Sequence, residues 1–209
     1  NKLGEARNLD VLLRRRSEAL ATDARQRLVE ERTRAYDDVI KALRSPEVRT
    51  MMLDLVEWIA LADFVGNDAS VRASAHSPLR PFATEVLRRF WKKVRRGGRN
   101  FATLDDEARH ELRISSKKLR YATEFFAALY DKRAERRDKF ISQLQELQED
   151  LGELNDLATE RALEARLAAL GIDLPVHGEA GGDDKHKADL IARSDATYRE
   201  LADIGPFWR

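Results

Sequence analysis

A period of about 3.6 residues in the apolar side chains runs through most of the 209-residue chain and limits what it can fold into. Leu, Ala, Glu, Arg and Lys dominate the sequence, and all five are strong helix formers. No stretch of strand length alternates convincingly between apolar and polar residues. We therefore expect an all-α fold of six or seven helices.

Pro and Gly mark several ends of the expected helices. The second helix stops before Ser45-Pro46, because a residue that precedes a proline is disfavoured in helical conformation. The short junction predicts an antiparallel hairpin with the third helix. Residues 67–79 are expected to form a loop. The other helices are expected at about 3–21, 81–97, 104–130, 134–170 and 185–202.

The third helix, expected over about 47–64, is rich in large apolar side chains. Such a helix normally packs most of its surface against other elements. We therefore predict that six of its residues lie in the core: Met52, Leu53, Val56, Trp58, Ile59 and Ala60.

Two ten-residue segments resemble each other and indicate an internal repeat. LGEARNLDVL, residues 3–12, and LGELNDLATE, residues 151–160, share their first three residues, and Leu9 aligns with Leu157. A match this short is weak evidence of duplication in a chain rich in Leu and Glu. A repeat would divide the chain into residues 1–79, the remainder of a first repeat with a loop, and residues 80–209, a second repeat.

Positive charge is concentrated in one part of a nearly neutral chain. Residues Arg80 to Arg120 contain 13 Lys and Arg against 5 Asp and Glu, whereas the whole chain has a net charge of +1. This asymmetry favours an anionic partner at one place. The chain has no cysteine, which excludes disulfides and thiolate metal sites. No apolar run approaches the length of a membrane span.

The segment HELRISSKKLR, residues 110–120, separates its charges from its apolar residues. At 100° per residue, four side chains fall within an arc of about 80°, opposite Leu112 and Leu119. Lys118 stands apart from these four, and Tyr121 borders them. We call the four the cationic arc: His110, Arg113, Lys117 and Arg120.

The preceding helix repeats this separation. Its apolar half carries side chains such as Phe82, Leu87 and Trp91, with Lys93 as its one cation. Its polar half carries six cations, which we call the basic row: Arg88, Arg89, Lys92, Arg95, Arg96 and Arg99.

Both sets place like charges four residues apart, as in Arg88/Lys92 and Arg113/Lys117. Each such pair destabilises a helix by roughly 0.2–0.5 kcal/mol. A solvated structural face would alternate Glu with Lys at lower cost, so we favour an anion-binding surface over an ordinary solvated face. Cations without interleaved exposed aromatics suit phosphate oxygens better than stacked bases. A P-loop nucleotide site is excluded, because no GxxxxGK[ST] segment is present.

The same segments resemble a known family. HELRISSKKLRYATEFF, followed by LQELQEDLGELND, is similar to the second repeat of a CHAD domain, the conserved histidine α-helical domain. VLRRFWKKVRRGGRN, LGEARNLDVLL and the terminal PFWR also resemble that family. The resemblance covers nearly the whole chain, and it implies two pseudo-symmetric helical bundles of long antiparallel helices.

The resemblance also implies a binding module, not an enzyme, that holds inorganic polyphosphate or another polyanion in a basic groove. By motif position the cationic arc carries the binding residues, and the basic row adds to them. Lys118, Tyr121 and Arg7 are further candidates for polyphosphate binding. No cofactor and no metal are implied. As in some members of the family, a linked or associated CYTH triphosphatase domain is an implied partner.

We expect a cytoplasmic location, in association with polyphosphate granules. The absent cysteines fit a reducing compartment. The first residues, NKLGEARNLD, have no signal-peptide core. The sequence leaves the oligomeric state open.

One part of the family pattern has no counterpart in residues 1–209. His110 lies 41 residues before Leu151, so a matching helix of the first repeat would lie about 40 residues before Leu3. We therefore expect the first His-x-x-Arg helix, and with it half of a symmetric basic groove, to be missing from this chain.

Two other functions stay open. A metal-dependent phosphohydrolase could use an acidic stretch of the sixth helix to hold Mg²⁺, although we expect this stretch to offset the basic helices instead. A scaffold could dock an acidic protein or nucleic acid on the basic faces, but specific nucleic-acid binding is not expected, because no DNA- or RNA-reading motif is present. The acidic stretch comprises Glu149, Asp150, Glu153 and Asp156.

Metal ligation by His110 is not expected. Arg113 and Lys117 lie one turn away on the same face, and their positive charges repel a metal ion. No HExxH pattern or other second ligand lies near it in the sequence.

Overall fold

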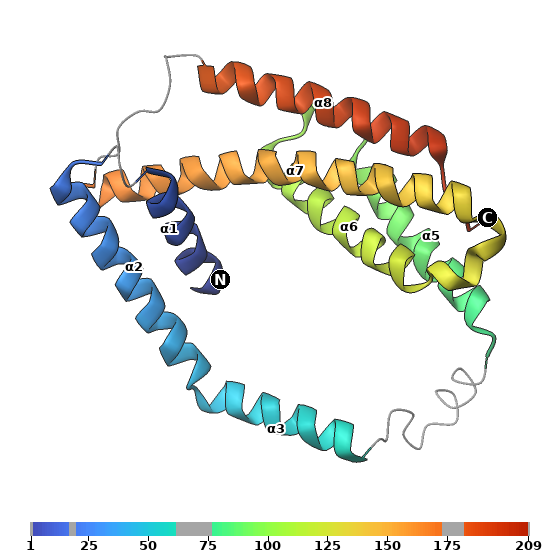
Figure 1. Cartoon of the computed structure of the whole chain (residues 1–209), viewed down its shortest axis with the longest axis horizontal. Helices are drawn as coiled ribbons and strands as arrows, with labels where there is room; N and C mark the ends of the chain where they lie inside the picture. Colours follow the sequence, from blue (N-terminus) through green and yellow to red (C-terminus); the bar gives the residue numbers. More distant parts are fainter. Residues whose placement is uncertain (1, 17–19, 62–76, 173–181, 209) are drawn as a thin grey trace. The chain divides into compact units, whose positions relative to one another are not determined.

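The computed structural model describes residues 2–16, 20–61, 77–172 and 182–208, which form seven α-helices and no strand (Figure 1). The all-α prediction is confirmed. None of the described helices is both long and apolar enough to cross a bilayer. The helices are α1 (Lys2–Arg16), α2 (Thr22–Leu43), α3 (Pro46–Leu61), α5 (Leu79–Gly97), α6 (Asp106–Phe125), α7 (Ala134–Ala169) and α8 (Gly182–Ile204).

The chain forms two compact units. Unit 1 comprises Asn1–Ser77 and Glu160–Val176, and unit 2 comprises Pro78–Thr159 and His177–Arg209. Helix α7 therefore contributes its first part to unit 2 and its last part to unit 1. The division into two compact units does not show that the chain arose by duplication. The predicted repeats, residues 1–79 and 80–209, and their pseudo-symmetry therefore stay predictions. Most of the loop expected at 67–79 lies outside the described residues.

Unit 1 has its own small core, in which α1, α2 and the end of α7 meet. Leu9 and Leu28 are fully buried there, and Leu167 packs with them. Asp10 of α1 accepts hydrogen bonds from the Tyr36 hydroxyl and the Arg32 guanidinium of α2. These two donors hold the pKa of the Asp10 carboxyl below its usual value. The polar clamp lies beside the apolar contact and fixes α1 against α2.

Helix α3 differs from the sequence prediction. Figure 1 shows α3 leading away from the end of α2, so the predicted antiparallel hairpin is wrong. The chain bends at Arg44–Ser45 through helical-type hydrogen bonds and does not reverse. The predicted core assignment is wrong as well, because no described element covers these side chains: Met52, Leu53, Val56, Trp58, Ile59 and Ala60 are all exposed.

Unit 2 packs α5, α6, α8 and the first part of α7 around a larger core (Figure 1). Leu87 and Val94 of α5 meet Leu112 and Leu119 of α6 there, and all four are buried. The two residues of each helix are seven apart and therefore share one face of that helix. The predicted apolar stripes of both helices are therefore the packing faces.

Phe207 and Trp208 of the C-terminal PFWR segment complete this core. Phe207 is fully buried, and Trp208 is 5% exposed. Both rings pack edge-to-face against Phe140 of α7, with ring centroids 5.8 and 5.3 Å away. Edge-to-face packing of aromatic rings stabilises such clusters beyond area burial. The last described residues thus close one end of unit 2.

Helix α6 begins and ends at defined residues. The Asp105 carboxylate caps its start by accepting a hydrogen bond of 2.8 Å from the backbone N–H of Ala108. The helix ends at Phe125, earlier than the predicted end near residue 130, and a 3₁₀ segment, η2 (Ala127–Arg133), follows. The backbone of Tyr130 departs from helical geometry. Its buried ring packs on Phe207 of the unit 2 core.

Candidate anion-binding surface

The cationic arc lies on the side of α6 that faces away from the apolar core. Leu112 and Leu119 are buried on the opposite face. Lys117 and His110 are exposed, whereas Arg113 and Arg120 are half-buried. The helical wheel predicts this arrangement, because it places the four residues opposite the apolar stripe, which faces the core.

His110 contacts a residue far away in the sequence. Its Nδ1 atom lies 2.6 Å from the side-chain oxygen of Asn155 on α7. An amide oxygen only accepts, so Nδ1 donates in this contact. The contact sets the ring orientation and leaves Nε2 as the second hydrogen-bonding atom. The HELR and LGELND segments of the sequence therefore meet at one point in space.

Arg120 is held by two partners. Its Nε donates to Gln148 on α7 at 3.0 Å, and its Nη1 lies 2.7 Å from the Glu124 carboxylate. The side chain of Gln148 in turn donates to the backbone carbonyl of Ser116 at 3.2 Å. Arg120 is thus positioned at the junction of α6 and α7, with its charge partly neutralised.

Tyr121 lies beside the cationic arc, as predicted. The Lys117 Nζ and the Arg120 guanidinium carbon are 5.7 and 4.8 Å from the centre of its ring. A cation over an aromatic face is attracted by the negative ring surface. The ring itself is half exposed.

The basic row is exposed along α5, and its last member, Arg99, lies just beyond the end of that helix. All six of its side chains reach solvent, and Arg88 pairs with Glu85 at 2.6 Å. Five of the six border a shallow concavity of about 390 Å³ that also touches Trp91, which we call the α5 groove. Arg89 is the member of the row outside that lining. The five are Arg88, Lys92, Arg95, Arg96 and Arg99.

A second concavity, of about 600 Å³, lies between α5 and α6, and we call it the α5–α6 groove. It is bordered by Lys93 and Lys118, the two cations that the wheels set apart, together with Arg96 and Arg99. The last two therefore border both grooves. No residue of the cationic arc lines either groove, since the arc occupies the other edge of α6.

Arg7, the last predicted site residue, is exposed on α1 in unit 1. In the alignment of the two repeat segments it occupies the position of Asn155. Its part in binding stays a prediction.

Comparison with known families agrees with the motif geometry. The family model for the CHAD domain matches residues 1–165, which is most of the chain. The chain belongs to the CHAD domain family. The match ends within α7, before α8 begins. No curated protein and no solved structure matches the chain.

In this CHAD domain, two residues that position the cationic arc were not among the predicted site residues. Asn155 lies in the LGELND segment that carries the resemblance, so its position in the motif was a usable signal. Gln148 lies two turns earlier on the same helix. Only the packing of α7 against α6 brings both amides to the arc.

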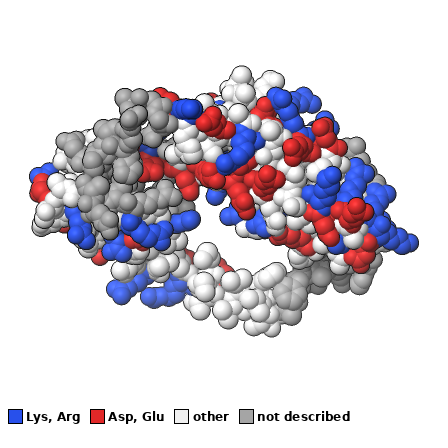
Figure 2. All heavy atoms as spheres, turned by 45° about the horizontal axis from the view of Figure 1, so that its top comes forward, with Lys and Arg blue, Asp and Glu red and all other residues white. Residues whose placement is uncertain are grey.

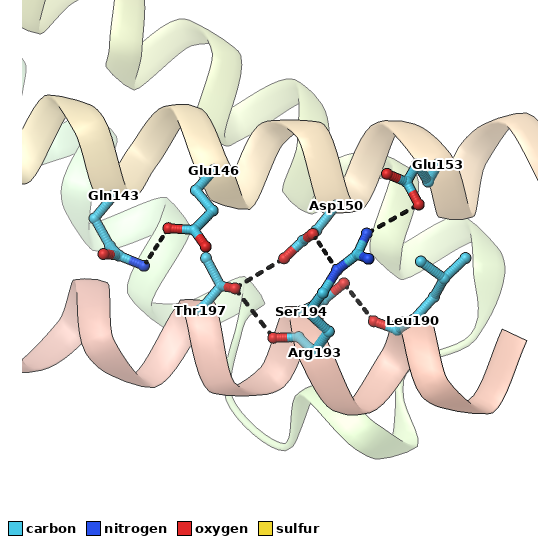
Figure 3. A network of polar contacts seen from close by, with 8 residues as sticks. All are labelled: Gln143, Glu146, Asp150, Glu153, Leu190, Arg193, Ser194 and Thr197. Carbon is cyan, nitrogen blue, oxygen red and sulfur yellow. Dashed lines mark hydrogen bonds and ion pairs between the residues drawn. The ribbon is translucent and has the colours of Figure 1, made fainter. Parts of the chain in front are cut away.

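Two acids of the acidic stretch of α7, Asp150 and Glu153, are directed at α8 (Figure 3). The buried Asp150 accepts hydrogen bonds from the Arg193 Nε at 2.7 Å and from the Thr197 hydroxyl at 2.8 Å. Glu153 lies 2.9 Å from Arg193 Nη2. The expectation that these two acids offset the basic helices is therefore wrong, because α8 supplies their cation. Among the described residues, no three His, Asp or Glu side chains gather where they could hold a metal ion.

The separation of charge on α5 and α6 is not a property of the whole CHAD domain. On the face drawn in Figure 2, acidic and basic side chains are interspersed. Helix α8 shows the same mixture, with Arg193 paired to Asp150 and Arg199 paired to Asp195. Neutralised pairs of this kind are the ordinary pattern for a solvated surface.

Proposed function

We propose that this CHAD domain binds inorganic polyphosphate or a chemically similar polyanion through the cationic arc and the basic row. The proposal rests on one observation, the number of cations on two sequential helices that lack a neutralising partner. Within the described part of the chain, seven members of the two sets form no ion pair: Arg89, Lys92, Arg95, Arg96, Arg99, Arg113 and Lys117.

Unneutralised cations favour a ligand with many closely spaced negative charges. Polyphosphate carries its charges on oxygens that accept hydrogen bonds from Arg and Lys. The bidentate geometry of Arg suits phosphate particularly well. His110 adds Nε2 as a further hydrogen-bonding atom at one end of the arc. The general association of the family with polyphosphate supports the same ligand.

Charge reversal in the cationic arc tests the proposal. We would measure the affinity for long-chain polyphosphate by titration calorimetry, comparing wild type with Arg113→Glu/Lys117→Glu. The matched control is Lys132→Glu/Lys139→Glu, which makes the same charge change at exposed positions of unit 2 that belong to neither set. We expect the arc variant to lose most of the affinity and the control to retain it. Equal losses of affinity in the two variants would show that only the total charge matters, and would overturn the proposal.

Salt dependence and competition sharpen the same experiment. Each neutralised phosphate should contribute a slope of about 0.7–0.9 to the log–log salt dependence, by analogy with nucleic acids. Displacement of polyphosphate by DNA or RNA at equal phosphate concentration would assign the surface to another partner. Phosphate release with Mg²⁺ tests the prediction that the domain is not an enzyme. A CYTH partner, a cytoplasmic location and granule association stay predictions.

A further inference from the structure

The α5–α6 groove has a lining that a linear polyphosphate chain does not use. One part of its surface is apolar and comes from Phe90, Leu104, Leu112 and Ile114. Leu112 belongs to the core, and the other three are half-buried. A chain of phosphates has no apolar part to place against such a wall. The groove therefore differs in chemistry from the exposed arc, which presents charge to solvent.

The rim of the groove is positively charged. Lys93, Arg96, Arg99 and Lys118 are exposed, and none of them forms an ion pair within the described residues. Glu111 also borders the groove, yet no cation of the rim lies within salt-bridge distance of it. Ser115 adds a hydroxyl. The rim thus offers several donors for phosphate oxygens and one carboxylate that can accept from a ligand hydroxyl or amine.

The size of the groove fits a small molecule. Its volume of about 600 Å³ lies within the roughly 300–1,000 Å³ usual for small-molecule sites. Gly97 also borders the groove, where a Cβ would lie at an ordinary 3.4 Å from Leu112 Cδ1. Pockets of this kind combine an apolar wall with a few polar groups that fix orientation.

We propose that the α5–α6 groove binds a phosphorylated small molecule that carries an apolar or aromatic moiety, of the nucleoside polyphosphate class. The phosphates contact the cations of the rim, the planar moiety lies against the apolar wall, and Glu111 accepts a hydrogen bond from a ligand hydroxyl. This site is separate from the cationic arc, although Arg96 and Arg99 also belong to the basic row. The proposal does not depend on polyphosphate binding by the arc.

Two probes with the same number of phosphates separate the contributions. ATP and inorganic triphosphate would be titrated calorimetrically at one ionic strength and without divalent cations. We expect ATP to bind at least about tenfold more tightly than triphosphate, because only ATP places apolar surface against the wall. Equal affinities would overturn the proposal and reduce the groove to a patch of phosphate-binding charge.

Matched pairs of variants locate the site. Lys93→Ser/Lys118→Ser removes two positive charges from the groove, and Arg113→Ser/Lys117→Ser removes two from the arc. We expect the groove pair to lower ATP affinity at least about tenfold and the arc pair to change it less than about threefold. Equal effects of the two pairs on ATP would overturn the proposal. Loss of polyphosphate binding in the arc pair alone tests the proposed function and leaves the groove unaffected.

A variant without a charge change tests the shape of the groove. Ser115→Phe fills the space between α5 and α6 while the rim keeps its cations. We expect ATP binding to be lost and long-chain polyphosphate binding to be retained, with circular dichroism confirming the fold. Undiminished ATP binding in folded Ser115→Phe would place the nucleotide elsewhere. If that variant does not fold, the two charge pairs decide the question.

Discussion

The Nδ1 atom of His110 lies 2.6 Å from the side-chain oxygen of Asn155 and joins two segments that are 45 residues apart in the sequence. The histidine belongs to α6 and the asparagine to α7. Asn155 therefore holds the imidazole in one orientation, with Nε2 as its second hydrogen-bonding atom. The packing of α6 against α7 therefore brings the two side chains together.

A double-mutant cycle tests the coupling between these two residues. We expect His110→Ala and Asn155→Ala each to weaken polyphosphate binding about three- to tenfold, and the double variant to bind no worse than His110→Ala. The reason is that Asn155 acts only through the ring. Calorimetric affinities for the four proteins provide the measurement. Strictly additive losses would show that Asn155 contributes independently of His110.

Gly98 is required by the close approach of a ring. A Cβ at this position would lie 2.1 Å from the Cε2 atom of Tyr198, whose hydroxyl donates to the Arg95 carbonyl at 3.0 Å. We expect Gly98→Ala to lower the free energy of unfolding by about 1–3 kcal/mol, because the ring or the helix must move. Thermal and urea unfolding measure the effect.

Two control variants accompany the Gly98 prediction. Gly97→Ala should be tolerated, since its Cβ meets Leu112 Cδ1 at an ordinary 3.4 Å. In the background of Tyr198→Ala, the added methyl group at Gly98 should cost little. A Gly98→Ala variant as stable as wild type would contradict the contact.

Asp150 fastens α8 to α7. Its side chain is 6% exposed, and Asp150→Ala leaves Arg193 and Thr197 without their acceptor. We expect a loss of roughly 2 kcal/mol in the free energy of unfolding. This is less than the cost of breaking a fully buried pair, because the Arg193 side chain is 51% exposed.

A neighbouring acid on α7 supplies the control. Glu153 also pairs with Arg193 but is 53% exposed, so Glu153→Ala should cost at most about 1 kcal/mol. Chemical unfolding of both variants makes the comparison. Equal losses would show that burial of Asp150 does not matter.

The stability of unit 2 should decline in acid partly through Asp106. A hydrogen bond from Lys187, at 2.9 Å, lowers the pKa of the Asp106 carboxyl, and nearby Arg109 lowers it further. A depressed pKa in the folded state means that the stabilisation is complete above the unfolded value of about 3.9. It is lost as pH falls through the lower folded value.

Urea unfolding between pH 7 and pH 2.5 tests this dependence. We expect Asp106→Asn to be less stable than wild type at neutral pH, with the difference shrinking below about pH 4. Glu107→Gln removes the same charge in the same turn of α6 and provides the control. A constant difference at all pH values would show that the ion pair with Lys187 does not contribute.

The local structure of this domain followed closely from the sequence. Helix periodicity and cap signals are properties of neighbouring residues, so the limits of α5 and α7 and the packing faces of α5 and α6 were predictable. The cationic arc was predictable for the same reason, since its four residues share one face of a single helix. The wheels also set Lys93 and Lys118 apart from their neighbours.

Contacts between distant segments were decided only by the tertiary structure. The same apolar pattern predicts burial in α3 and in α5, yet within the described residues neighbouring helices cover the apolar face of α5 and not that of α3. The wheels could not show that Lys93 and Lys118 border one groove, because a wheel contains no partner helix. By itself the sequence determined which faces are apolar or cationic, a matter of local periodicity. Packing decided which of those faces meet.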